Sequence, residues 1–190
     1  MNNVILTIKK LEESGYSSAM YGLSLNKKQP IEKMEKVSNM LCKHDNGHNK
    51  FLEFIYVWLE VIAPRYWWAE ADTYRLTTKQ SESTIHTLAE ELNGLQVGDL
   101  DDFIKRNFEP GSIKIMDMVT IYVASRRGDF LTVKRCLPEG YLQKRIWCLN
   151  YKTLRNIIIQ RKNHKLPHWR IFINSMLDQV NNPELLPKET

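Results

Sequence analysis

The richest run of apolar residues in the chain leads up to a proline. Residues 51–62 are apolar and aromatic except for two glutamates, which predicts a long and mostly buried strand. Pro64 breaks this pattern, and a proline is well placed at the first turn of a new helix, here predicted over residues 65–74. Residues 77–84 are polar and rich in hydroxyl groups, and we expect them to form a loop. A strand, a helix and a polar loop in this order are typical of a site mounted on a rigid frame.

Apolar residues at helical spacing predict helices over most of the remaining chain. The expected helices are residues 15–25, 30–41, 83–94, 100–107, 112–125, 130–136, 151–162 and 167–177. Two further strands are expected at Val4–Lys9 and Gly140–Leu149, where apolar and β-branched residues gather. Helices outnumber strands, and the strands do not alternate with helices as repeated β-α-β units. The predicted fold class is therefore α+β.

Three of the predicted helices begin next to a residue whose side chain can cap a helix N-terminus. Ser83 or Thr84 precedes the helix that ends at residues 93–94, Asp99 precedes residues 100–107, and Asn150 precedes residues 151–162. Short polar side chains at these positions accept hydrogen bonds from the first backbone N–H groups of a helix.

Length and composition predict an ordinary soluble domain. A chain of 190 residues can form one domain with a sizeable core, which we expect over residues 1–180, with a loose tail over residues 181–190. A content of 43% hydrophobic and 26% charged residues is usual for globular proteins. No apolar run reaches the ~18–20 residues of a membrane span, and the N-terminus lacks the apolar core of a signal peptide. We therefore expect a cytoplasmic protein without a membrane partner.

Charge and cysteine content narrow the classes of partner and cofactor. Three widely spaced cysteines favour neither a disulfide framework nor a zinc site. His44 and His48 are four residues apart, but the Asp-Asn-Gly sequence between them disfavours a shared helix, so we predict no metal site. The net charge of +5 favours an anionic partner without choosing among phosphate, nucleic acid and a membrane surface.

Two blocks of residues carry a resemblance to a known family. The first begins at Gly47-His48, continues through Glu53 and Pro64, and reaches His86 without a gap. It resembles the flavin-dependent thymidylate synthases, whose motif is Arg-His-Arg-x-x-Ser-x-Asn-Glu-x-Ser-x-Arg-Tyr. The motif falls on residues 73–86 of this chain.

Most charged residues of that motif are replaced here. Arg75 and Ser83 are kept, whereas Thr73 and Tyr74 stand in place of the first Arg and the His, and Ile85 stands in place of the last Arg. Up to two charges that would face the phosphates of the flavin are lost, each worth ~1–3 kcal/mol as a charge-assisted hydrogen bond.

The second block spans residues 134–171. Lys134-Arg135-Cys136-Leu137-Pro138 matches an Arg-x-x-Leu-Pro of the family, and Asn150-Tyr151-Lys152-Thr153-Leu154 matches an Asn-x-Arg-x-Leu that opens a helix. Arg161 falls where the family has the Arg that contacts the pyrimidine. His168-Trp169-Arg170-Ile171 then corresponds to a Gln-x-Glu-Ile near the start of the closing helix.

The resemblance implies both a fold and an activity. The implied fold is α+β, with a small antiparallel or mixed sheet flanked by long helices. The implied activity is methyl or other one-carbon transfer to a deoxypyrimidine monophosphate such as deoxyuridine monophosphate (dUMP), with FAD as cofactor and NADPH and methylenetetrahydrofolate as co-substrates. It also implies a homotetramer whose active sites each combine several subunits. The cofactor carries the hard chemistry, so no protein nucleophile is required.

The resemblance assigns roles to ten residues. Arg161 would be catalytic, because a fixed cation beside a pyrimidine carbonyl stabilises the enolate-like charge that develops on the ring. The substrate-binding residues would be Ser83, Lys134, Arg135, Glu70 and His86, and the cofactor-binding residues would be His48, Arg75, Asn150 and Lys152. Glu70 stands where the family has a Gln near the nucleotide, and a carboxylate there favours a base with an amino donor, such as cytosine.

Six of the ten residues have a simpler alternative role. Arg161 can be a solvated cation at a helix C-terminus, and the Lys134–Arg135 pair can be solvated as well. Ser83 and Asn150 can be helix caps, and His48 can be a structural residue of a turn.

A second function remains open beside the enzymatic one. A flavin-free relative could use the same basic cleft to bind a nucleotide or nucleic acid without chemistry. Trp67, Trp68 and Tyr74, next to Arg65 and Arg75, could stack on bases, although such an aromatic row is more often part of a core.

Overall fold

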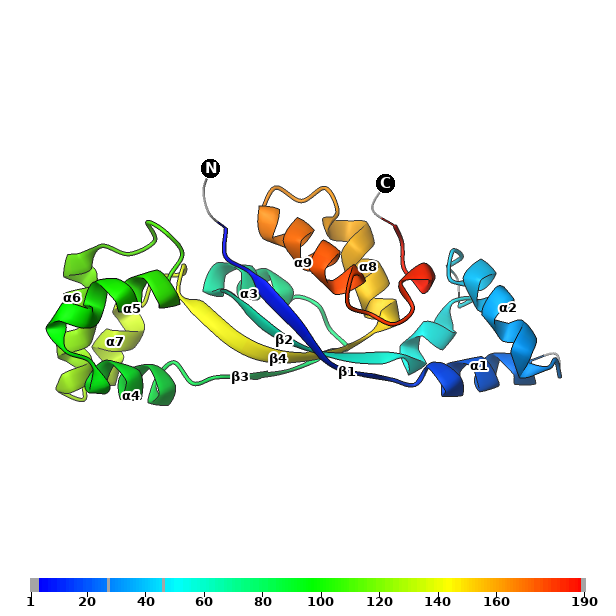
Figure 1. The fold of residues 1–190 in the computed structure, drawn as a ribbon, viewed down its shortest axis with the longest axis horizontal. Helices are drawn as coiled ribbons and strands as arrows, with labels where there is room; N and C mark the ends of the chain where they lie inside the picture. The colour runs from blue at the N-terminus through cyan, green and yellow to red at the C-terminus, as the bar shows by residue number, and fades with distance from the viewer. Residues whose placement is uncertain (1–3, 27, 46, 189–190) are drawn as a thin grey trace. The chain divides into compact units, whose positions relative to one another are not determined.

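A four-stranded sheet with strand order β1-β2-β4-β3 organises the fold, which is α+β as predicted (Figure 1). The structure is a computed structural model that describes residues 4–26, 28–45 and 47–188. The strands are β1 (Thr7–Ser14), β2 (Tyr56–Pro64), β3 (Thr78–Ser81) and β4 (Leu142–Asn150). The sheet is antiparallel. At opposite ends of the β2–β4 pair, Tyr151 N donates to Ile55 O at 2.9 Å and Arg65 N donates to Tyr141 O at 3.1 Å.

Helices account for most of the other described residues. They are α1 (Tyr16–Leu25), α2 (Met34–Leu41), α3 (Arg65–Ala71), α4 (His86–Gly94), α5 (Leu100–Asn107), α6 (Ile115–Arg126), α7 (Phe130–Cys136), α8 (Tyr151–Arg161) and α9 (Pro167–Leu177). Short 3-10 helices cover Ile31–Lys33, Lys50–Phe54, Val97–Asp99 and Pro183–Leu185. Every helix predicted from apolar spacing is present, with shifted ends in several cases.

Strand β2 alternates between a buried and a more open face. Val57, Leu59, Val61 and Ala63 are fully buried, whereas the residues between them are half-buried or exposed. The strand was expected to begin at residue 51, and this part of the prediction is wrong. Phe51 and Leu52 are both buried although adjacent, and a strand would point two neighbouring residues to opposite faces. Residues 50–54 form a 3-10 helix instead.

The two edge strands differ from the predictions. Residues 78–81 were expected to form part of a polar loop, but they form β3 beside β4. An edge strand pairs its backbone on one side only and does not need an apolar face, so its polar residues hide it from pattern analysis. Strand β1 was expected at Val4–Lys9 and lies at Thr7–Ser14, a stretch whose residues are mostly exposed.

The chain divides into two compact units. Among the described residues, unit 1 comprises residues 4–6, 62–73 and 80–145, and unit 2 comprises the described parts of residues 7–61, together with residues 74–79 and 146–188. Unit 1 contains α3 to α7, and unit 2 contains α1, α2, α8 and α9. The expectation of one domain over residues 1–180 stays a prediction.

Each unit has its own core. In unit 1, apolar side chains of α4, α5 and α6 pack together with Phe108, Val133, Leu137 and Tyr141. In unit 2, α8 contacts α9 and α9 contacts β1. The buried residues of α8 and α9 include Leu154, Ile157, Ile158, Trp169, Phe172 and Met176, which are shielded from water together with Trp147 and Leu149 of β4.

The C-terminal segment is packed rather than loose over much of its length. Leu185 and Leu186 are buried, and Glu13 accepts a hydrogen bond from Asn181 N at 2.7 Å. Asn182 N donates to the Tyr151 hydroxyl at 3.2 Å. A loose tail was predicted because residues 181–190 are mostly polar and contain prolines. The two leucines within this segment are nevertheless buried and hold it against the rest of unit 2. Residues 189–190 lie outside the described part of the chain.

Candidate functional site

Ser83 caps the turn that opens α4, two residues before the N-cap position at Ile85. Its Oγ accepts hydrogen bonds from the backbone N–H groups of Ile85 at 3.2 Å and His86 at 3.0 Å. A helix N-terminus carries partial positive charge and aims N–H groups outward, so this end of α4 suits an anion. His86 is the first residue of α4, and it is exposed.

Lys134 reaches the same end of α4 from another helix. Its Nζ donates a hydrogen bond to Oγ1 of Thr84, the buried residue that follows Ser83. We call Ser83, Thr84, His86 and Lys134 the α4 cluster. Arg135 is exposed in the last turn of α7, directly after Lys134.

A carboxylate lies beside the α4 cluster in the sequence and is fixed to β4. Glu82 Oε1 accepts a hydrogen bond from Lys144 N at 2.8 Å, and Glu82 N donates to Lys144 O at 3.1 Å. Burial raises the pKa of the Glu82 carboxyl, and the hydrogen bond from Lys144 opposes this shift. The pairing with β4 thus fixes the backbone that leads into the cap.

Glu70 lies half-buried on α3 in unit 1, where its carbonyl oxygen accepts a hydrogen bond from Thr73 Oγ1 at 2.7 Å. Two residues later, both carboxylate oxygens of Asp72 accept hydrogen bonds from Arg145 NH1, at 3.1 and 3.0 Å. The Arg145 guanidinium lies 4.6 Å from the centre of the Trp68 ring. The sequence analysis did not single out Arg145, which holds the end of α3 against β4.

Arg161 ends α8 in unit 2 and is surrounded by aromatic groups. Its Nε donates to the Tyr74 hydroxyl at 2.8 Å. Its guanidinium carbon lies 4.8 Å from the Trp169 ring centre and 5.5 Å from the Tyr74 ring centre. Both distances fall within the range of cation–π attraction. Arg75, the residue after Tyr74, is exposed.

The turn after α2 meets the start of α8. Lys152 Nζ donates to Oδ1 of the buried Asn49 and lies 3.8 Å from Asp45 Oδ1. Arg155 NH1 pairs with the same Asp45 oxygen at 2.9 Å. His48 precedes Asn49 directly, so the structure brings this predicted residue to the same turn as Lys152. The His48 ring is exposed and meets the His44 ring edge-on at 6.3 Å between centroids.

Asn150 caps α8, as predicted. Its Oδ1 accepts a hydrogen bond from Thr153 N at 2.9 Å, and the side chain is buried. Asn150 and Lys152 therefore both lie at the start of α8, Asn150 as its N-cap and Lys152 in its first turn.

The groups near this turn match what a flavin diphosphate requires. Lys152 supplies an ammonium group, and the exposed His48 ring supplies a further N–H donor at this turn, while the exposed Arg75 guanidinium lies elsewhere in the sequence of unit 2. Diphosphate oxygens are acceptors that such donors bind well. In chemical type, these residues fit FAD, although the motif charges at positions 73, 74 and 85 are absent.

The metal and thiol chemistry of the described residues is limited. Within residues 4–26, 28–45 and 47–188, no group of three or more His, Cys, Asp or Glu side chains is placed to hold a metal ion. Cys42, Cys136 and Cys148 are free thiols. Burial raises the pKa of the Cys42 and Cys148 thiols, which disfavours their reactive thiolate forms.

No helix in the described part of the chain combines the length and the apolar character needed to cross a bilayer.

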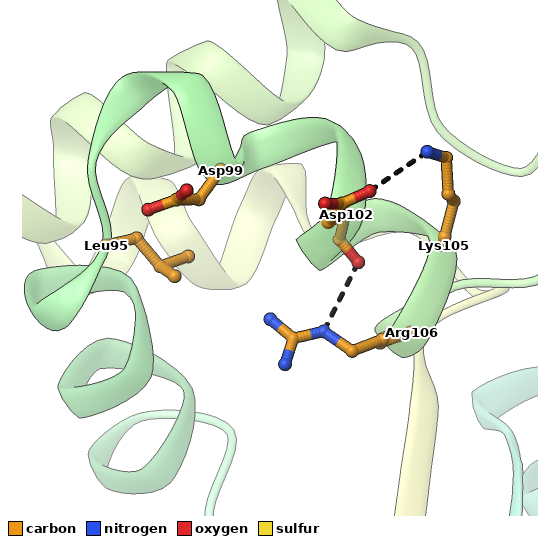
Figure 2. A pocket seen from close by; sticks show the side chains of 5 residues that line it. All are labelled: Leu95, Asp99, Asp102, Lys105 and Arg106. Carbon is orange, nitrogen blue, oxygen red and sulfur yellow. Dashed lines mark hydrogen bonds and ion pairs between the residues drawn. The ribbon is translucent and has the colours of Figure 1, made fainter.

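A cavity of about 600 Å³ lies elsewhere in unit 1 (Figure 2). It is lined by Leu95, Asp99, Asp102, Lys105 and Arg106. Lys105 pairs with Asp102 at 2.9 Å, and Arg106 Nε donates to the Asp102 carbonyl at 3.3 Å. None of the predicted site residues lines it. The candidate groups are therefore described for each unit by itself: the α4 cluster in unit 1, and Arg161 and the start of α8 in unit 2.

Comparison with known proteins supports the fold. No family model and no curated protein matches the sequence. Among solved structures, the chain is similar to thymidylate synthase X (ThyX) from Helicobacter pylori with FAD and dUMP, with a TM-score of 0.79 and 14% identity over 93% of this chain and 94% of that chain. A second structure of flavin-dependent ThyX from the same organism, complexed with FAD and dUMP, has a TM-score of 0.79 and 14% identity over 94% of this chain and 97% of that chain. The fold implied by the two sequence blocks is thereby confirmed.

Proposed function

We propose that the chain binds a deoxypyrimidine monophosphate and FAD, and that it transfers a one-carbon unit to the pyrimidine in the manner of a flavin-dependent thymidylate synthase. The observation that carries this proposal is the fold likeness, which extends over nearly the whole chain to structures holding FAD and dUMP. The proposal includes methylenetetrahydrofolate as the one-carbon donor, NADPH as the reductant, a homotetramer and a cytoplasmic location.

The α4 cluster supports a phosphate role. Ser83 orders the first N–H groups of α4, and Lys134 brings a cation to the adjacent Thr84. A capped helix N-terminus and an ammonium group together favour a phosphate monoester. We assign Ser83, Lys134, Arg135 and His86 to the nucleotide phosphate.

Arg161 supports a pyrimidine role. Its guanidinium is held by Tyr74 and Trp169 rather than extended into solvent. A cation fixed before the reaction stabilises negative charge developing on a pyrimidine carbonyl without the cost of reorganisation. The resemblance implies active sites shared between subunits, so the phosphate and pyrimidine groups of one site come from different copies of the chain.

The residues near the flavin would bind and orient it. His48, Arg75, Asn150 and Lys152 are assigned to FAD, which supplies the redox chemistry when bound. Asn150 already uses its Oδ1 as a helix cap, so its amide NH₂ is the group that would face the cofactor.

The replaced motif residues favour a second candidate, a flavin-free relative that binds nucleotide without catalysis. Thr73, Tyr74 and Ile85 leave fewer charges for phosphates than the family motif supplies. The nucleic-acid form of this candidate loses its main support, because Trp67 and Trp68 are fully buried and cannot stack on bases. Tyr74 instead packs against Trp169, with 5.8 Å between ring centroids.

An absorbance spectrum of the purified protein, with and without added FAD, tests the proposal first. Bands near about 375 and 450 nm that survive desalting are expected for a working flavin site. Titration with dUMP and with deoxycytidine monophosphate would then identify the base, and tighter binding of the cytidine nucleotide would support the role assigned to Glu70. A colourless protein that binds dUMP but retains no FAD would favour the flavin-free candidate. A protein that binds neither ligand would contradict both.

A further inference from the structure

Tyr74 occupies the position of the histidine in the family motif and makes a different set of contacts. It lies in unit 2 between α3 and β3 in the sequence, and its side chain is partly buried. Its ring meets Trp169 edge-on, with an interplanar angle of 71°. The phenol therefore extends from a fixed ring.

The hydroxyl of Tyr74 makes two hydrogen bonds of opposite sense. It accepts from Arg161 Nε at 2.8 Å and donates to Gln160 Oε1 at 3.1 Å. Donation to Gln160 orients the phenolic proton away from the guanidinium and leaves an oxygen lone pair facing Arg161. The two bonds thus support one another in a short chain through Gln160, Tyr74 and Arg161.

Trp169 contacts the guanidinium at the same time. The guanidinium carbon lies 4.8 Å from the Trp169 ring centre. Because a guanidinium is planar and rigid, one hydrogen bond at Nε and one aromatic contact together restrict the directions of both terminal nitrogens. A long side chain at the end of a helix would otherwise sample many rotamers and lose that freedom on binding a ligand.

We propose that Tyr74 is a positioning residue that pre-orients the Arg161 guanidinium toward the pyrimidine. This inference rests on the proposed function, since it specifies how the same nucleotide site is prepared. With tyrosine in place of the motif histidine at position 74, the chain loses a charged group. It gains a neutral hydroxyl that accepts a hydrogen bond from Arg161 and so holds the guanidinium in place. Tyr74 acts through Arg161 and not on the flavin phosphates.

Tyr74→Phe tests the inference, because it keeps the ring and removes both hydrogen bonds of the hydroxyl. We expect the affinity for dUMP to fall about 5–10-fold, which corresponds to one modest hydrogen bond. In an Arg161→Lys background, which lacks the Nε–H group, the same change should alter affinity less than about 2-fold. Tyr21→Phe, at an exposed tyrosine of α1, is the matched control and should leave the affinity unchanged.

A measurement without nucleotide separates this inference from the proposed function. The Arg161 Nε–H should give a slowly exchanging proton signal by NMR in the wild-type protein, and this signal should broaden or vanish in Tyr74→Phe. Equal affinities of wild type and Tyr74→Phe for dUMP would overturn the inference even if the proposed function holds. If the wild type binds no dUMP, the proposed function fails. The Nε–H signal then decides whether Tyr74 orients Arg161, and an unchanged signal in Tyr74→Phe would overturn the inference as well.

Discussion

Arg155 brings a guanidinium group into the buried part of unit 2. Its Nε donates to the Cys42 carbonyl at 3.1 Å, and its NH1 pairs with Asp45 at 2.9 Å. Asp45 itself is largely exposed, so the pair is only half desolvated. Arg155 therefore connects α8 to the end of α2 through the Cys42 carbonyl, and to the following turn through the Asp45 carboxylate.

Replacing Arg155 by methionine should lower the free energy of unfolding by about 2–3 kcal/mol. The change keeps most of the side-chain volume but leaves the Cys42 carbonyl without its charged donor. A buried acceptor that loses its partner costs free energy because it is also shielded from water. Urea denaturation followed by circular dichroism measures the difference. Arg106→Met on the exposed face of α5 is the control, and its effect should stay within about 0.5 kcal/mol. Equal effects of the two substitutions would contradict the importance given to Arg155.

The sequence contains a signal for Arg155 that the motif comparison passed over. Tyr151, Leu154 and Ile158 are spaced as one face of a helix, and Arg155 falls on that face. A lone charged residue on an apolar face predicts a buried ion pair. By contrast, the partner could not be predicted, because Asp45 lies 110 positions away and the contact depends on how the turn after α2 packs.

At the scale of secondary structure elements, the N-terminus of α4 combines a structural and a proposed binding role in one residue. Ser83 caps the helix whether or not a phosphate binds there. Alanine at this position would remove both roles together and could not distinguish them. Aspartate separates them, because it is as good a cap as serine but places a negative charge where the phosphate is proposed.

Ser83→Asp should therefore keep the stability of the protein while weakening its binding of dUMP by about tenfold or more, since like charges repel at a site that binds an anion. Ser83→Thr, which retains a capping hydroxyl without the charge, is the control and should affect both quantities little. Thermal unfolding and nucleotide titration give the two readouts. Unchanged dUMP affinity in Ser83→Asp would place the phosphate elsewhere and leave Ser83 as a cap alone.

Elements with strong local signals were predicted well, including strand β4, whereas the weakly marked edge strand β3 was not. Residues 100–107 and 130–136 form α5 and α7 with the predicted bounds, because their apolar spacing lies within the segment. The predicted side-chain cap of α5 by Asp99 is wrong, since the Asp99 carboxylate accepts a hydrogen bond from Gln96 N at 3.1 Å instead. Strand β3 was missed because its partner, β4, is remote: the contact between Glu82 and Lys144 spans 62 positions. Among the candidate site residues, the cap at Asn150 was predicted from the sequence, while the contacts of Tyr74 with Arg161 required the fold.

At the scale of the whole molecule, two buried phenols and one half-buried phenol make stability sensitive to alkaline pH. Burial raises the pKa of Tyr66, Tyr141 and Tyr151 above the ordinary value of about 10. Glu109 adds to the shift at Tyr66, and Glu13, which accepts a hydrogen bond from the Tyr151 hydroxyl at 2.6 Å, adds to the shift at Tyr151. Tyr66 and Tyr141 belong to unit 1, and Tyr151 belongs to unit 2.

The sign of the effect follows from proton binding. Between pH 10 and the raised pKa values, the unfolded chain loses phenolic protons that the folded chain keeps, so the unfolded state is favoured as pH rises. The stability that these groups contribute is fully present below pH 10 and is lost above it. For each of the well-buried Tyr141 and Tyr151, the free energy of unfolding should fall by up to about 1.4 kcal/mol per pH unit in this range.

Tyr151→Phe isolates one of these contributions. The variant has one fewer phenol to ionise, so its free energy of unfolding should decline less steeply above pH 10 than that of the wild type, by up to about 1.4 kcal/mol per pH unit. Urea denaturation at several pH values between 8 and 11 gives the slopes, and the values at pH 8 separate the cost of the lost Glu13 hydrogen bond from the effect of ionisation. The phenolate absorbance that the wild type gains over Tyr151→Phe should appear together with unfolding. If the two slopes were equal, Tyr151 would be able to ionise within the folded protein, and the Glu13 pairing would not hold its proton.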